Sequence, residues 1–284
     1  MVAALPLFGA FMLGLGVRRQ LQRHFALLFR LQLALGIGVL AVLAGWSFEP
    51  SARNVGALAV VLLAQVTSVV LAAHLFRART DGPLLAFGMY GNPTFWSLPV
   101  TAATLGPHAA VFVVAYDMLT QGRIALGVKL LRMRAPVEQS GRSALADYAP
   151  TAGAVAGLLL GRAVEAPAAI ATVVTVLGTA MALVGSVLLG VAWPREWIGR
   201  VEARLALRGL ALHVTLVPSL LGAATLLGMQ LPGAAWILAL GPLPTSVVAF
   251  AKLYGYSTRT AASGLALSVA LAIALLPVAL ALGA

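Results

Sequence analysis

The sequence contains no cysteine and few charged residues. Among its 284 residues there is no cysteine, which excludes disulfide bonds and thiol-ligated metal sites. Only 10% of the residues are charged and 61% are hydrophobic, whereas a soluble domain carries roughly 25% charged residues. This composition predicts a polytopic membrane protein.

The common enzyme motifs are also missing. There is no His-Glu-x-x-His, no glycine-rich phosphate loop and no Gly-x-Ser-x-Gly. The 4 histidines are scattered and do not have the spacing of metal ligands. We therefore expect no enzymatic activity, no metal site and no bound cofactor. Without a nucleotide-binding loop, transport would have to be driven by an ion gradient, the membrane potential or downhill flux.

Long apolar stretches make up most of the chain. About 20 apolar residues cross a bilayer, and on that scale the sequence predicts an all-α integral membrane fold with ten transmembrane helices. The first stretch is apolar from its start and reaches Arg18 only at its end, the reverse of a cleavable signal, so we expect it to be retained. The predicted spans are roughly 2–17, 25–46, 54–76, 83–105, 108–131, 148–164, 167–193, 206–228, 232–253 and 260–282.

The distribution of basic residues supports this span count. Of the 19 lysines and arginines, fifteen fall in odd-numbered connections and only Arg53 and Arg162 in even-numbered ones. The positive-inside rule makes the odd-numbered connections cytoplasmic and both termini extracytoplasmic. The same distribution accounts for the net charge of +11 without nucleic-acid binding. It predicts a multi-pass protein of the cell's inner or plasma membrane.

Two of the apolar stretches are interrupted by proline at corresponding places. Superposing Pro93-Thr94 on Pro244-Thr245 gives an offset of 151 residues, from 93 to 244. Proline removes an amide donor and clashes with the preceding helical turn, so spans four and nine should each be two half-helices joined by unwound backbone. Paired interruptions of this kind indicate the binding site of a secondary transporter.

The span count also predicts how the halves are related. Five spans in each half is an odd number, so the second half enters the membrane in the opposite sense, as an inverted-topology repeat. We expect a first repeat at 1–131, a cytoplasmic linker at 132–147 and a second repeat at 148–284.

Asp117 is the only acidic residue well inside a predicted span. An intramembrane carboxylate indicates a functional site by default; it can take up a proton, ligate a cation, or anchor the unwound backbone of a neighbouring helix. Gln121, four residues later, shares its helix face. Gln65 belongs to a polar patch in the third span, for which interhelical hydrogen bonding is the alternative explanation. These three residues are candidates for coupling or for orienting the site.

Candidate substrate-binding residues lie mainly at the two breaks. Asn92 carries both a donor and an acceptor, and it can contact a ligand or cap a half-helix. The N-terminal ends of the half-helices favour an anion. Arg123 either binds a substrate carboxylate bidentately or extends toward the cytoplasmic headgroups. The full set is Asn92, Pro93, Thr94, Ser97, Pro244, Thr245, Ser246 and Arg123.

These segments resemble the auxin efflux carrier family of permeases. The resemblance covers essentially the whole chain in span number and order. Thr94 and Ser97 stand where the family has glycines. The most specific matches are Asn92 to Pro99, Gly106-Pro107, Tyr116-Asp117, and Leu243-Pro244-Thr245 through Ala251 to Gly255.

The resemblance implies a scaffold and a moving transport domain that holds two crossed, broken helices. From it we expect a secondary active transporter for a small organic anion such as a carboxylate, with an elevator-like alternating-access motion and H⁺ or Na⁺ as coupling ion. Its partners would be the anion, the lipid bilayer and, through the glycine-rich scaffold helices, a second copy of the chain. Three alternatives stay open: a passive anion channel through the same crossing, a sodium-coupled bile-acid-type symporter, and a non-transporting receptor or intramembrane enzyme.

Overall fold

The computed structural model describes residues 4–75, 96–118, 148–194 and 199–283. Nearly all of these residues are helical and none lies in a strand, which confirms the all-α prediction. The helical runs that are long and apolar enough to cross a bilayer are Arg18–Trp46, Ile170–Ala192 and Thr258–Leu282, and shorter apolar helices are Leu5–Gly16, Ala52–Ala64 and Val214–Leu226. The structure is therefore that of a helical membrane protein. The count of ten, the repeat and the sides of the termini stay predictions.

The described helices follow the predicted apolar stretches closely. Those before the midpoint of the chain are α1 (Ala4–Gly16), α2 (Arg18–Leu21), η1 (Gln22–His24), α3 (Phe25–Leu31), η2 (Gln32–Ile37), α4 (Gly38–Trp46), α5 (Ala52–Leu75), α7 (Leu98–Leu105) and the helical residues 107–118. Those after it are α9 (Ala149–Ala163), α10 (Ile170–Ala192), α11 (Arg200–Leu226), α12 (Gly233–Ala239), α13 (Ser246–Tyr254) and α14 (Thr258–Gly283).

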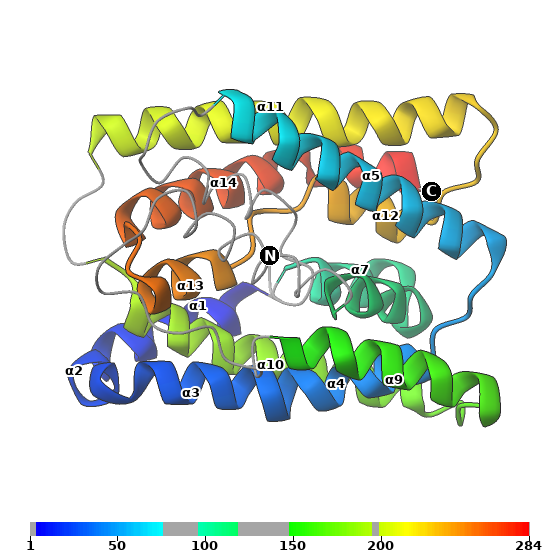
Figure 1. Cartoon of the computed structure of the whole chain (residues 1–284), viewed down its shortest axis with the longest axis horizontal. Coiled ribbons are helices and arrows are strands. Elements are labelled where there is room, and N and C mark those ends of the chain that lie inside the picture. The colour runs from blue at the N-terminus through cyan, green and yellow to red at the C-terminus, as the bar shows by residue number, and fades with distance from the viewer. Residues whose placement is uncertain (1–3, 76–95, 119–147, 195–198, 284) are drawn as a thin grey trace.

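One layer of helices is packed through glycine. It consists of α1, the continuous run from α2 to α4, α9 and α10, and we call it the glycine layer; most of it forms the lower edge of Figure 1. Within it α4 packs on α9 and α1 packs on α10. A Cβ at Gly157 would overlap the Val42 carbonyl, and one at Gly14 would overlap the Val187 carbonyl. Only glycine lets these backbones approach so closely.

The remaining described helices form a second group. It consists of α5, α7, residues 107–118 and α11 to α14, and we call it the break layer; α5 and α11 lie along the upper edge of Figure 1. Here α11 packs on both α5 and α14, and α12 packs on α14. The helices α7 and α13 lie between the two edges and contact α10 of the glycine layer. The two layers therefore meet at the segments that follow the prolines.

Candidate functional site

The second predicted break is present in the structure. Helix α12 ends at Ala239 and α13 begins at Ser246, and the residues between them are not helical. Pro242 and Pro244 lie within this stretch and have no amide hydrogen. Every residue from 233 to 251 is buried, so the unwound chain is enclosed by protein, one of the two situations in which such backbone is tolerated at membrane depth; the other is the lining of a cavity.

The chain after the first break contacts the second break. Asn92, Pro93 and Thr94 lie outside the described residues, but Ser97 is fully buried beside Gly241, where a Cβ would come within 3.0 Å of the Ser97 Oγ. Helices α7 and α12 are in contact as well. The structure thus brings together the two proline-containing segments that are far apart in the sequence.

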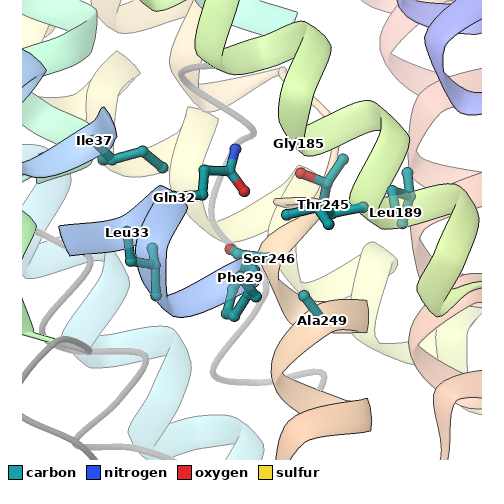
Figure 2. A pocket seen from close by; sticks show the side chains of 10 residues that line it. Phe29, Gln32, Leu33, Ile37, Gly185, Leu189, Thr245, Ser246 and Ala249 are labelled. Atoms are coloured by element: carbon teal, nitrogen blue, oxygen red, sulfur yellow. The ribbon is translucent and has the colours of Figure 1, made fainter. Parts of the chain in front are cut away.

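A small cavity lies where α13 begins. Its walls come from α3 and η2, from α10 and from the start of α13, and Figure 2 shows Gln32, Thr245 and Ser246 facing the same space. The cavity volume is about 20 Å³, which is room for about one water molecule. The lining residues are Phe29, Gln32, Leu33, Ile37, Gly185, Leu188, Leu189, Thr245, Ser246 and Ala249.

Buried hydroxyl groups mark this region. Ser246 is 7% exposed and Ser97 fully buried, and neither Oγ has a hydrogen-bond partner among the described residues. Leaving a buried polar group unpaired costs about 1–3 kcal/mol. Thr245 is also buried, and its neighbour Pro244 lies in the unwound stretch itself. These four predicted residues therefore lie at or beside one break. Three of them carry hydroxyls, and those of Ser97 and Ser246, which have no partner among the described residues, can bind a ligand or water.

The predicted coupling residues are described only in part. Asp117 is buried, 5% exposed, and belongs to the described helical residues 107–118. This helix is held to α9 by the Thr151 hydroxyl, which donates to the Met118 carbonyl at 2.9 Å. Gln121 and Arg123 lie outside the described residues. Gln65 lies in α5, and its side chain is outside the described part.

Two residues that hold this region together were not predicted from the sequence. Gln32 lines the cavity and its Nε2 donates to the Met181 carbonyl of α10 at 3.1 Å. It lies at the start of η2, a π-helical turn, and such turns occur frequently at functional sites. Ser268 of α14 accepts a hydrogen bond from the Leu243 amide at 2.9 Å. The sequence signal for Gln32 was a side-chain amide inside an apolar span. No local feature of the sequence distinguished Ser268 from the other serines of its helix.

A larger cavity lies away from the predicted site residues. Its volume is about 400 Å³. It lies between the chain around the start of α5, the helical residues 107–118 and the chain around the start of α12. None of the predicted site residues lines it. Its lining consists of Ser47, Phe48, Glu49, Asn54, His108, Ala109, Val111, Phe112, Pro232 and Ala234.

No known protein-family model matches the chain, and no curated protein matches it either. The resemblance to auxin efflux carriers therefore stays a prediction from the sequence.

Proposed function

We propose that this protein is a secondary active transporter for a small organic anion, with its substrate site at the cavity beside the second break. The observation that carries the proposal is the unwound, fully buried stretch 240–245 between two half-helices. Such backbone is tolerated at membrane depth where it is buried in protein or lines a cavity, and interruptions at corresponding places in two halves point to a transporter's binding site. The similarity to auxin efflux carrier permeases is part of this proposal.

The chemistry around the break favours an anion. Helix α13 begins at the cavity with the hydroxyls of Thr245 and Ser246, and its first amides carry the partial positive charge of a helix N-terminus. The Ser246 hydroxyl has no partner among the described residues and is free to donate. No residue lining this cavity is acidic. A carboxylate would therefore find donors here without a repelling charge.

Matching contacts in the glycine layer support the inverted repeat. Gly14 meets the Val187 carbonyl, just as Gly157 meets the Val42 carbonyl. These pairs are related by offsets of 143 residues in the short helices (14 to 157) and 145 in the long ones (42 to 187).

The same two offsets relate a second set of contacts. Gly190 lies against the backbone of Phe11, and Gly45 lies against that of Ala154; 11 to 154 is again 143, and 45 to 190 is again 145. The same register in the α1–α10 pair and in the α9–α4 pair is what a repeat predicts. These contacts favour a first repeat at 1–131 and a second at 148–284. The proposal also includes ten spans with both termini outside, which the distribution of basic residues supports.

The size of the cavity favours alternating access over a permanent pore. About 20 Å³ holds about one water molecule, so a carboxylate can enter only if α13 moves relative to α3 and α10. Because α13 belongs to the break layer and α3 and α10 to the glycine layer, this opening is a relative displacement of the two layers. That is the motion expected of an elevator-like carrier with a scaffold.

Uptake into proteoliposomes tests the proposal. A panel of labelled mono- and dicarboxylates would be offered while imposed proton and sodium gradients are varied separately. Saturable uptake with counterflow of unlabelled substrate is expected. Single-channel conductance without counterflow would instead support the passive channel, and uptake driven only by a sodium gradient would support the bile-acid-type symporter. Binding without flux for every compound would contradict transport.

Asp117→Asn tests the coupling role. The variant removes the charge but keeps the shape of a buried side chain, and an intramembrane carboxylate is the expected carrier of a coupling proton or ion. We expect uptake driven by the ion gradient to be abolished while the variant elutes as a monodisperse folded protein. Unchanged gradient-driven uptake would remove Asp117 from the coupling mechanism.

A further inference from the structure

The only amide between the two prolines of the second break is that of Leu243. Pro242 and Pro244 have no amide hydrogen, and Gly241 before them donates to the Leu238 carbonyl at 3.3 Å. The Leu243 amide donates to Ser268 Oγ at 2.9 Å. Since both residues are buried, water does not replace this bond, and its partner decides whether the unwound chain is stable in the membrane.

The direction of the hydrogen bonds at Ser268 is fixed. Its hydroxyl donates to the Leu265 carbonyl of its own helix at 2.7 Å. A hydroxyl has one hydrogen and two lone pairs, so the oxygen that meets Leu243 acts as an acceptor. The acceptor at position 268 therefore fixes the backbone of Leu243. It thereby positions the short segment that follows, whose Thr245 and Ser246 line the cavity.

Position 268 has a counterpart in the first half of the chain. The offset of 151 residues that superposes the two Pro-Thr pairs also relates the starts of two described helices, at 107 and 258. Applied to Ser268, the same offset gives Asp117, which is likewise buried. An ionised carboxylate is purely an acceptor. The two matched positions therefore both carry acceptors, but only one of them can change its charge.

We propose that Ser268 is the positioning residue of the second break and the uncharged counterpart of Asp117. Ser268 fixes the backbone of its break permanently through the Leu243 amide. Asp117 occupies the equivalent position in the first half, where gain or loss of a proton or cation changes the local charge. The two halves thus divide the work, with an anchor of constant charge at Ser268 and an ionisable group at the matching position 117. The role of Ser268 in transport rests on the proposed function, whereas its role as an anchor of the backbone does not.

Thiol labelling tests the anchor without assuming transport. The chain has no cysteine, so Ser246→Cys provides a single reactive site beside the break. In membranes treated with N-ethylmaleimide we expect slow labelling of Ser246→Cys alone. Adding Ser268→Ala should accelerate it about tenfold, the scale of one lost buried hydrogen bond. Adding Ser268→Thr, which keeps the hydroxyl, should restore the slow rate.

Ser263→Ala is the matched control. Ser263 lies on the same helix and is equally buried, but its Oγ has no partner among the described residues, so its removal should leave the labelling rate unchanged. Equal rates in the Ser268→Ala and Ser263→Ala backgrounds would overturn the anchor role, whether or not any carboxylate is transported.

Two further readouts complete the test. If Ser268→Ala yields no folded protein, amide hydrogen exchange of the wild-type chain decides. In a fragment that begins at Gly241 and ends at Pro244, the Leu243 amide is the only internal amide that carries a hydrogen. We expect this amide to be protected; exchange as fast as in an exposed loop would overturn the proposal. In proteoliposomes that transport a carboxylate, Ser268→Ala should raise KM while the dependence on the ion gradient persists. Loss of that dependence would contradict the division of work between Ser268 and Asp117.

Discussion

Helices of the glycine layer approach one another backbone to backbone, whereas helices of the break layer surround a stretch of chain that is not helical at all. In the first group the close approach uses Gly14, Gly45, Gly157 and Gly190, and a side-chain hydrogen bond from Gln32 to the Met181 carbonyl joins two of its helices. In the second group, one buried hydroxyl, that of Ser268, accepts a hydrogen bond from unwound backbone, and another, that of Ser246, has no partner among the described residues.

This difference separates stability from function. Backbone contact without side chains leaves the glycine layer one tight way to pack, because any added carbon overlaps a neighbouring carbonyl. The break layer carries polar groups that cost folding free energy and are useful only if something binds them. Substitutions in the glycine layer should therefore act on folding, and those at the break on ligand binding.

The largest effect is expected for Gly14→Ala. Its Cβ would overlap the Val187 carbonyl of α10, and overpacking of this kind costs about 1–3 kcal/mol. We expect a lower melting temperature and a loss of monodisperse protein, measured by size-exclusion chromatography in detergent after heating. Gly9→Ala on the same helix is the control, because a Cβ there meets nothing within 4 Å. Equal stability of the two variants would contradict the role assigned to the glycine layer.

Ser246→Ala should have the opposite profile. The hydroxyl it removes has no partner among the described residues, so folding should be unchanged or slightly improved. Substrate binding should lose one hydrogen bond, worth about 0.5–1.5 kcal/mol, which raises KM for the transported carboxylate several-fold with little change in maximal rate. Ser263→Ala, another buried hydroxyl without a described partner and off the cavity, should leave KM alone. A KM unaffected by Ser246→Ala would place the substrate elsewhere.

Lys252→Met tests the contact between the two layers. The Lys252 Nζ donates to the Val191 carbonyl at 2.9 Å and lies 4.6 Å from the centre of the Phe25 ring, so it joins α13 to α10 and α3. Loss of the interaction with the ring costs about 1 kcal/mol. This changes the equilibrium constant between the closed and the open arrangement of the two layers about fivefold. Maleimide labelling of Ser246→Cys should therefore become several-fold faster.

A control on α11 separates this contact from a general effect of charge. Arg208 is exposed, and Arg208→Met should not alter the labelling rate. If both substitutions act equally, the effect comes from lost positive charge and not from the contact between layers.

The smallest effect is expected for the loss of an ion pair at the surface of the break layer. Arg259 and Glu202 form an ion pair at 3.6 Å, with side chains 44% and 17% exposed. Exposed pairs of this kind contribute about 0–1 kcal/mol. Arg259→Gln should shift the melting temperature only slightly, and salt should remove the difference. A large loss of stability would mean that this pair, and not the packing of α11 on α14, holds the two helices together.

Much of the fold was predictable from local features. The apolar stretches gave the helices to within a few residues, as at α5 and α10, because a helix is the way an apolar segment satisfies its own backbone in lipid. Pro242 and Pro244 predicted the second break because proline cannot continue a helix. Thr245 and Ser246 were predicted site residues and do line a cavity.

Other features depend on contacts between distant residues. Gln32 reaches α10 across 149 positions of sequence, and Ser268 reaches the break across 25. A glutamine or serine in an apolar helix usually serves packing or a local hydrogen bond, so composition alone does not distinguish these two. Arg123 and Gln121 lie outside the described residues and stay predictions.

The sequence by itself determined that this chain belongs in a membrane, where its helices run, and that one of them breaks at Pro242 and Pro244, because hydropathy and the missing proline amide act on the residue that carries them. Only the tertiary structure decided that the Leu243 amide donates to the Ser268 hydroxyl, which glycines bring α1 and α10 together, and that the cavity at Ser246 has a volume of only about 20 Å³. Those outcomes depend on distances between segments that are far apart in the chain, and packing alone sets such distances.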